Sequence, residues 1–343
     1  FAMLISMEMG KPLAEARGEV AYGNEFLRWF SEEAVRISGR YGTSPEGAGR
    51  MLVAQRPVGP AFAITPWNFP LAMATRKIGP AIAAGCTMVV KPAELTPLTT
   101  LLLVATLEEA GLPAGVVNVI TTSTSSATSA PIISDARLRK ITFTGSTQVG
   151  VMLLEQSAKR VLRTSMELGG NAPFLVFEDA DIDAAVNGAM LAKMRNIGQA
   201  CTAANRFIVH ESVADEFGQK FAERMSALKL GRGLAENTTC GPVINEKARE
   251  NMTRLVEATK SQGASVLAGG GSVDGDGYFF EPTVLDHVAP GSTILQEEIF
   301  GPIAPITRFK TEEEAVRLAN DTEFGLVSYA FTQDLKRGLR LIE

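Results

Sequence analysis

The sequence predicts an α/β fold with two domains built on largely parallel sheets. From residue 58 onward, short apolar runs alternate with helix-like stretches, and many of these runs are apolar at every position. Strands that are apolar on both faces and separated by helices are typical of a parallel doubly wound sheet, because helices cover both of its sides. At 343 residues the chain is long enough for two domains. Such sheets bind ligands at the carboxyl ends of their strands.

The composition is that of a globular protein acting on a small molecule. Hydrophobic residues make up 45% of the chain, and 33 Lys and Arg against 38 Asp and Glu give a net charge of -5 without charge blocks. This balance favours neither nucleic acid nor a membrane as a partner. Three cysteines without regular spacing make neither a disulfide framework nor a metal site. We therefore expect a cytoplasmic protein without a metal.

Both ends of the sequence have the character of interior segments. Phe1 is an unusual first residue, and residues 336–343 have the pattern of an amphipathic helix without a cap. We expect the chain to be the central part of a longer protein, truncated at both ends.

The first 57 residues are expected to be largely helical. A helix should end at Gly10, and a long amphipathic helix should follow over residues 20–37, where apolar residues recur at helical spacing. Residues 39–57 combine a Gly- and Ser-rich stretch with an alternating one, which predicts a protruding hairpin.

Later elements follow from apolar runs and helix-start patterns. Thr96 as N-cap and Pro97 at the first helical position predict a helix over residues 98–109. Ser212 and Asp215 form a potential capping box for a helix over residues 213–228. Residues 121–129, rich in Thr, Ser and Ala, should be a polar loop or a weak helix start. Strands are expected at residues 61–64, 87–90, 116–120, 140–143, 174–177 and 206–209.

Two reactive side chains stand at the middle of the chain. Glu167 precedes a Gly-Gly turn, and Cys201 follows a polar stretch among small residues. A carboxylate base and a thiol nucleophile offered from flexible connections are what covalent catalysis needs. Each has a plainer interpretation, since a single cysteine is more often a buried apolar residue and a glutamate before Gly-Gly more often a solvated helix end.

Three further motifs stand at expected strand ends. Residues 143–150 carry a strand into Gly145 and a helix near Ser146, whose free N–H groups could bind a pyrophosphate. Lys91 and Glu94 could meet ribose hydroxyls, although a plain strand-to-helix turn explains both motifs as well. Asn68, stiffened by neighbouring prolines, could donate to an oxyanion or merely cap the next helix.

Taken together, these motifs resemble the aldehyde dehydrogenase superfamily. The similarity rests on six motifs in the same order over nearly the whole chain, and it is greatest to the succinate-semialdehyde dehydrogenases. The motifs are Thr65-Pro-Trp-Asn-Phe-Pro, Lys91-Pro-Ala-Glu, Phe143-Thr-Gly-Ser-Thr, Glu167-Leu-Gly-Gly-Asn, Gly198-Gln-Ala-Cys and Glu298-Ile-Phe-Gly-Pro.

This resemblance implies a mechanism and a cofactor site. Cys201 would add to an aldehyde carbon, Asn68 would stabilise the oxyanion of the thiohemiacetal, and Glu167 would activate water to hydrolyse the thioester. The implied cofactor is NAD, with NADP as the alternative, because a 2′-phosphate would be repelled by Glu94. The implied cofactor-binding residues are Thr65, Pro66, Trp67, Lys91, Glu94, Gly145, Ser146, Leu168, Glu298 and Phe300.

The same resemblance implies a substrate and an assembly. Arg76 and Arg195 would bind the carboxylate of succinate semialdehyde; without the resemblance, both are ordinary solvated arginines. The alternatives are another aldehyde such as glutarate semialdehyde, or an inactive structural homologue. Residues 1–169 would bind NAD, with the hairpin at about 39–57 joining subunits of a homodimer or homotetramer, and residues 170–343 would form the catalytic domain.

Overall fold

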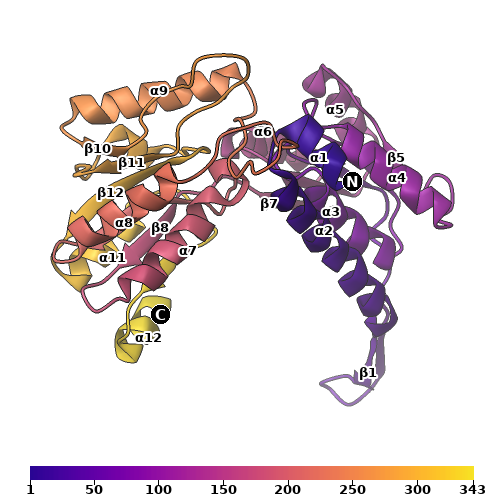
Figure 1. The fold of residues 1–343 in the computed structure, drawn as a ribbon. Coiled ribbons are helices and arrows are strands. Elements are labelled where there is room, and N and C mark those ends of the chain that lie inside the picture. Colours follow the sequence, from indigo (N-terminus) through magenta and orange to yellow (C-terminus); the bar gives the residue numbers. More distant parts are fainter. The chain divides into compact units, whose positions relative to one another are not determined.

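The computed structural model describes residues 1–343, which divide into two compact units (Figure 1). Unit 1 comprises Phe1–Met9 and Ala16–Leu168, and unit 2 comprises Gly10–Glu15 and Gly169–Glu343. The main division therefore falls between Leu168 and Gly169. Residues 10–15, which the sequence interpretation had left with the first domain, make their contacts in unit 2.

Unit 1 is built on a five-stranded sheet in the order β5-β4-β3-β6-β7, in which all pairs are parallel. The chain leaves the central strand β3 toward β4 and β5, then returns to the other side of β3 as β6. The sequence order thus reverses between β3 and β6. The strands are β3 Ala61–Ile64, β4 Met88–Lys91, β5 Val117–Val119, β6 Lys140–Thr144 and β7 Arg163–Glu167.

Helices cover both faces of this sheet. Ala63 and Val90 belong to an apolar cluster with α3 and α4, whereas Phe62 and Phe143 point to the opposite face, where α5 and α6 contribute Ile133 and other apolar residues. This alternation is what a strand buried on both faces requires. The helices are α1 Ala2–Met9, α2 Leu13–Glu33, η1 Ala34–Arg36, α3 Ala72–Ala83, α4 Leu98–Glu109, α5 Ser125–Ser134 and α6 Thr147–Ala158.

Unit 2 contains a six-stranded sheet in the order β10-β11-β12-β9-β8-β13. Only β10 is antiparallel to its neighbour. The strands are β8 Ala172–Val176, β9 Ala204–His210, β10 Ser265–Ala268, β11 Thr283–Asp286, β12 Ile303–Phe309 and β13 Tyr329–Phe331. The helices are α7 Ile182–Met194, η2 Arg195–Gly198, α8 Ala214–Ser226, α9 Glu246–Ser261, α10 Thr293–Gln296, α11 Glu312–Asn320 and α12 Leu335–Ile342.

The core of unit 2 is rich in aromatic side chains. Phe174 and Phe207 pack with Phe217 and Phe221 of α8 on one face, with ring centroids 5.1 to 6.4 Å apart. Residues one position along the same strands point to the opposite face, where α11 packs. The predicted α/β class with parallel sheets is therefore confirmed.

The expected hairpin is present. Strands β1 (Arg40–Thr43) and β2 (Arg50–Val53) pair antiparallel, and the hairpin projects from unit 1 beyond α2 (Figure 1). Tyr41 and Leu52 are among its exposed apolar side chains. Elsewhere in the chain, no helix combines the length and apolar character needed to cross a membrane.

Several helix-start predictions are wrong in detail. Thr96 does not cap α4, because its hydroxyl donates to the Trp67 carbonyl (3.2 Å). Ser212 does not cap α8, because its hydroxyl pairs with His210 Nδ1 (2.8 Å). Helix α2 covers Leu13–Glu33 rather than residues 20–37. The partner of Thr96 is 29 residues away in the sequence, whereas Ser212 bonds locally to His210, two residues before it.

A buried lysine lies in the core of unit 2. Lys193 of α7 has no exposed surface, and its ammonium donates to Asn205 Oδ1 on β9 (2.9 Å). Burial lowers the pKa of Lys193 from 10.5 to about 7, because the charged form loses its hydration without gaining a carboxylate partner.

Lys193 should make the stability of the protein depend on pH. Its folded pKa lies below its unfolded value, so the unfolded state binds more protons between about pH 7 and 10.5. The free energy of unfolding should therefore rise by about 2 kcal/mol from pH 7 to pH 9 through this group. Denaturant unfolding of Lys193→Met should lack this rise, whereas Lys247→Met, at an exposed lysine, should keep it. Equal pH dependence in all three proteins would contradict the assignment.

Candidate active site

The site residues predicted in unit 1 gather at the carboxyl edge of its sheet. In the strand register, Ile64 pairs with both Lys91 and Phe143, and Thr144 pairs with Glu167. The segments that follow β3, β4, β6 and β7 therefore leave the sheet side by side. They carry Thr65 to Asn68, Lys91 to Glu94, Gly145 with Ser146, and Glu167 with Leu168. The reversal of strand order between β3 and β6 is where open α/β sheets bind ligands.

The crevice between β3 and β6 suits a nucleotide. The hydroxyls of Thr65 and Thr144, the residues at the ends of these strands, are buried and have no hydrogen-bond partner in the protein. Ser146 is the N-cap of α6, and no side chain caps this helix. The first N–H groups of α6 are therefore available for an anion, as a pyrophosphate would require.

Lys91 and Glu94 behave differently from each other. Lys91 is buried, and its ammonium donates to the Pro92 carbonyl and to Ser125 Oγ of α5, both at 3.1 Å. Burial lowers the pKa of Lys91, and the nearby Glu94 carboxylate opposes this shift. Glu94 is exposed. The contact with Ser125 was not expected, because residues 121–129 carry no pattern beyond their polarity.

Asn68 is buried in the segment between β3 and α3, and the N-cap of α3 is Leu71, with no side-chain cap. The first N–H groups of that helix are instead bound by Glu19 of α2, whose Oε1 accepts from Leu71 (2.9 Å) and Ala72 (3.2 Å). The plainer interpretation of Asn68 as a helix cap is thereby removed. Its amide stays a candidate donor for an oxyanion.

Glu167 is the last residue of strand β7 rather than part of a flexible connection. Its side chain is exposed and lines a cavity of about 460 Å³ together with Arg76, Lys77 and Lys140. The strand was missed because its side chains alternate between exposed and half-buried positions and include few apolar residues. The sheet fixes the backbone from which this carboxylate projects, which suits a general base.

The site residues predicted in unit 2 gather at the amino edge of its sheet. Gly170 precedes β8, Cys201 precedes β9, and Glu298 and Phe300 precede β12; these three strands are neighbours and parallel. This edge is opposite to the one that the general rule for parallel sheets predicts. The thiol and its neighbours thus come from segments that enter the sheet.

Glycines allow these three segments to touch. A Cβ at Gly170 would overlap the Cys201 carbonyl, and one at Gly198 would overlap the Gly301 carbonyl. The Gly170 N–H donates to Glu298 Oε1 (3.2 Å), and burial raises the pKa of Glu298. The Cys201 segment therefore lies in direct backbone contact with its neighbours.

Cys201 is the only cysteine with partial exposure. Cys86 and Cys240 are buried, and burial raises the pKa of Cys240 to about 12. A thiol that cannot ionise is inert, whereas a nucleophile must be reachable. Of the three thiols, Cys201 is therefore the candidate for chemistry.

Comparison with known proteins settles the family. The family model described as "Aldehyde dehydrogenase family" matches residues 1–343. The chain belongs to the aldehyde dehydrogenase family.

Individual relatives refine this result. The chain is 61% identical over 343 residues to a succinate-semialdehyde dehydrogenase of Paenarthrobacter nicotinovorans, covering all of this chain and 76% of that protein. It is 49% identical over 342 residues to a glutarate-semialdehyde dehydrogenase of Pseudomonas putida, covering 100% and 71%. A crystal structure of succinate-semialdehyde dehydrogenase from Burkholderia pseudomallei matches with a TM-score of 0.97 and 49% identity, covering 99% and 70%.

In this aldehyde dehydrogenase, Arg195 lies on a second cavity. The cavity has a volume of about 920 Å³ and is lined by α7, by β13 and by Thr202, the residue after Cys201. Arg195 is exposed at the end of α7, and Tyr329 donates to the Thr202 carbonyl (2.8 Å). Arg195 and the Cys201 segment thus border one cavity in unit 2.

Arg76 and Lys77 lie on the cavity of unit 1. Arg76 donates to Tyr22 Oη (2.7 Å) and lies over the ring of Phe26, 5.0 Å from its centroid. Lys77 is buried, and its ammonium donates to Thr142 Oγ1 (3.0 Å). Burial lowers the pKa of Lys77 to about 8, and the Glu167 carboxylate opposes this shift.

Sequence reasoning gave Lys77 no role. The available clue was its place on α3, where the periodicity of Ala74, Ile78 and Ala81 puts position 77 on the buried side. A lysine on the apolar side of a helix needs a specific polar partner.

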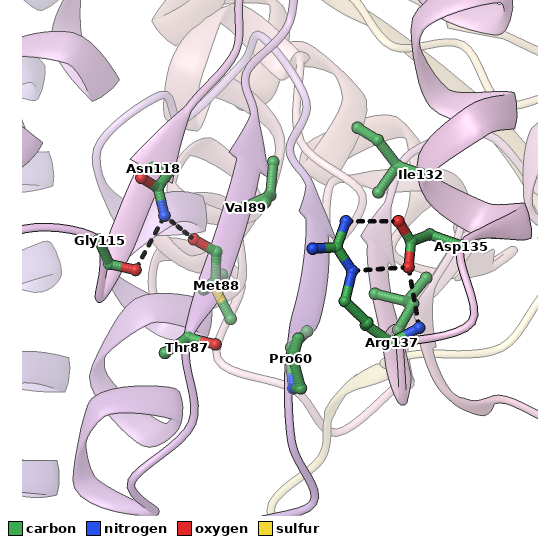
Figure 2. A pocket seen from close by; sticks show the side chains of 11 residues that line it. Pro60, Thr87, Met88, Val89, Gly115, Asn118, Ile132, Asp135 and Arg137 are labelled. Atoms are coloured by element: carbon green, nitrogen blue, oxygen red, sulfur yellow. Dashed lines mark hydrogen bonds and ion pairs between the residues drawn. The ribbon is translucent and has the colours of Figure 1, made fainter.

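A third cavity, of about 300 Å³, lies at the amino ends of β3, β4 and β5 (Figure 2). Its charged and amide side chains are already paired: Arg137 forms an ion pair with Asp135 (2.7 Å), and Asn118 donates to the Gly115 carbonyl (3.0 Å). It lies at the sheet edge opposite to the predicted site residues, and we assign no ligand to it.

Proposed function

We propose that this aldehyde dehydrogenase oxidises succinate semialdehyde to succinate with NAD(P). The observation that carries the substrate assignment is that Arg195 borders the same cavity as the segment of Cys201. A guanidinium can bind a carboxylate through two parallel hydrogen bonds, so it suits the far end of this substrate. The identity of 61% to a succinate-semialdehyde dehydrogenase supports the same choice.

Cys201 is proposed as the nucleophile. Its thiolate forms a bond to the aldehyde carbon, and the carbonyl electron pair moves to oxygen to give a thiohemiacetal. The backbone N–H of Cys201 and the Asn68 amide would stabilise this oxyanion, because fixed donors act most strongly where charge develops. Loss of a hydride from the carbon, as the oxyanion electrons return, leaves a thioester on Cys201.

Glu167 is proposed to act in the second half of the reaction. Its carboxylate takes a proton from water, and the resulting hydroxide attacks the thioester carbon. The carbon–sulfur bond breaks, the Cys201 thiolate leaves, and succinate is released. Because hydrolysis of the thioester is strongly favourable, the overall oxidation is irreversible in practice.

Bound NAD(P) supplies the hydride acceptor. Residues at the carboxyl edge of unit 1 would hold it: Thr65, Pro66 and Trp67 after β3, Lys91 and Glu94 after β4, and Gly145 with Ser146 at the start of α6. We propose that Leu168, Glu298 and Phe300 border its nicotinamide end. In this scheme residues 1–169 serve cofactor binding and residues 170–343 serve catalysis.

There are two alternatives to this proposed function, a different aldehyde substrate and an inactive homologue. Glutarate semialdehyde differs by one methylene, and the 49% identity to a glutarate-semialdehyde dehydrogenase supports it as the second candidate. An inactive homologue has no need of Cys201, Glu167 and Asn68 together.

We also propose that the protein forms a homodimer or homotetramer joined through the hairpin. Contacts between subunits would cover the exposed apolar side chains Tyr41 and Leu52. Light scattering would measure the mass of this oligomer.

Substitutions of Cys201 and Glu167 should separate the two halves of the reaction. Cys201→Ala should abolish turnover because no covalent intermediate can form. Glu167→Gln should leave acylation possible and stall hydrolysis, so a burst of NADH should precede slow turnover in stopped-flow absorbance. Steady turnover of Cys201→Ala near that of the parent would refute the mechanism.

Removal of the two arginines should reveal the substrate. Arg195→Ala and Arg76→Ala should each lower kcat/KM for succinate semialdehyde about ten- to a hundredfold, mainly through KM, because each loses a charged hydrogen bond worth about 1.5 to 3 kcal/mol. An uncharged aldehyde of similar length should be almost unaffected.

The matched control is Arg224→Ala. Arg224 lines the same cavity as Arg195, but it donates to Asn187 Oδ1 (2.7 Å). Its removal should therefore have little effect on kcat/KM for either the charged or the uncharged aldehyde. Equal losses with charged and uncharged aldehydes would assign the arginines to structure, and the substrate would revert to an unspecified aldehyde.

NAD should be preferred over NADP. The exposed Glu94 carboxylate would accept hydrogen bonds from ribose hydroxyls and repel a 2′-phosphate, which carries about -1.5 to -2 charges. Glu94→Ser should therefore raise kcat/KM with NADP relative to NAD, as followed by absorbance of the reduced cofactors. A parent enzyme with higher efficiency on NADP would contradict this assignment.

A further inference from the structure

We propose that Glu15 is a positioning residue for the segment that carries Cys201. It belongs to the short stretch Gly10–Glu15, which joins unit 2 although it is far away in sequence. Its carboxylate accepts a short hydrogen bond from the backbone N–H of Asn196. The inference rests on the proposed role of Cys201 as the nucleophile.

The backbone that Glu15 binds has an unusual conformation. Asn196, Ile197 and Gly198 form a left-handed turn, with φ of 55°, 62° and 76°. A β-branched residue such as Ile197 rarely adopts this conformation, because its Cβ crowds the backbone. The turn is also buried. A left-handed turn of this kind persists only where its surroundings hold it in place.

Two further bonds near the turn join neutral groups. Asn196 Nδ2 donates to the Gln199 carbonyl (3.0 Å), and Gln199 Oε1 accepts from the Ile244 N–H (3.0 Å). The bond from the Asn196 N–H to Glu15 joins a charged group to the first residue of the turn. Hydrogen bonds to a charged acceptor are roughly twice as strong as neutral ones. Glu15 is therefore a strong restraint on where the turn begins.

Glu15 is itself fixed on the body of unit 2. The Leu13 N–H donates to the Gly233 carbonyl (2.9 Å). Gly10, with φ of 95°, lies so close to Pro242 that a Cβ there would be 3.0 Å from Pro242 Cγ. The stretch is thus bonded at Leu13 and closely packed at Gly10, and it presents Glu15 to the turn from this base.

The electrostatic setting is consistent with this role. Burial raises the pKa of Glu15, while the Asn196 N–H and the positive charges of Lys11 and Arg195 oppose that rise. Burying a carboxylate is unfavourable unless it is bound specifically. Only two residues separate Gly198 of the turn from Cys201, so the direction of the turn sets where the Cys201 segment points.

The test compares Glu15→Ala with Glu15→Gln in the full chain. Glu15→Ala removes the acceptor and should lower kcat about ten- to a hundredfold with little change in the aldehyde KM. Glu15→Gln retains an oxygen that can accept the Asn196 N–H, and it should recover activity to within about tenfold of the parent. Glu25→Ala, at an exposed glutamate of the same helix, is the matched control and should leave kcat unchanged.

A second measurement tests the position of the Cys201 segment without any substrate. The rate of Cys201 alkylation by iodoacetamide should change in Glu15→Ala and return toward the parent rate in Glu15→Gln. Parent kcat and parent alkylation rate in Glu15→Ala would overturn the proposal. An equal loss of kcat in Glu15→Ala and Glu15→Gln would also overturn it. So would an effect confined to KM for a charged aldehyde, because Glu15 would then act on Arg195 instead.

The two proposals fail in different ways. If the parent enzyme oxidises no aldehyde, or if Cys201→Ala retains turnover, the proposed function fails. The alkylation contrast between Glu15→Ala and Glu15→Gln still decides whether Glu15 positions the segment, because that rate requires neither substrate nor cofactor.

Discussion

Close backbone packing at the amino edge of unit 2 is the constraint on which the proposed chemistry of Cys201 depends. At Gly170 and Gly198, neighbouring carbonyl oxygens occupy the space that any Cβ would need. The segments entering β8, β9 and β12 are consequently fixed against one another by main-chain atoms. The backbone positions from which side chains on these segments project are therefore fixed as well. A thiol on such a base loses little conformational freedom when it reacts.

Buried charges form the second layer of organisation. Arg206, almost wholly buried, donates to the carbonyls of Leu318 and Ala319 near the carboxyl end of α11 and to the Asn171 carbonyl beside β8. Its guanidinium thereby ties a helix end to the sheet, with the negative end of the helix dipole as partner. Lys77 in unit 1 similarly reaches a hydroxyl on β6. In both units, a buried cation donates hydrogen bonds to neutral oxygens and so fixes how a helix lies on the sheet.

Much of the architecture could be predicted because its causes are local or periodic. Apolar runs located most of the parallel strands, and the Gly-rich stretch located the hairpin. The sequence motifs predicted both the family and the candidate nucleophile. Strand β7 was missed because it has few apolar residues. The expected caps were wrong because Thr96 bonds to the distant Trp67 carbonyl and Ser212 to His210, two residues before it. Strands β10 to β13 were not predicted individually. Contacts such as Glu19 with α3, or Glu15 with Asn196, join residues separated by 52 and 181 positions. No local pattern contains them.

The distribution of the three thiols has a consequence for oxidation. Cys86 and Cys240 are buried, so a soluble oxidant reaches Cys201 before either of them. Position 203 of the same loop is a buried alanine, which offers no thiol to trap a sulfenic acid as a local disulfide. Oxidised Cys201 would then proceed toward the irreversible sulfinic state unless an external thiol rescued it. With Cys201 as the proposed nucleophile, the fraction of active enzyme therefore falls as this one sulfur is oxidised.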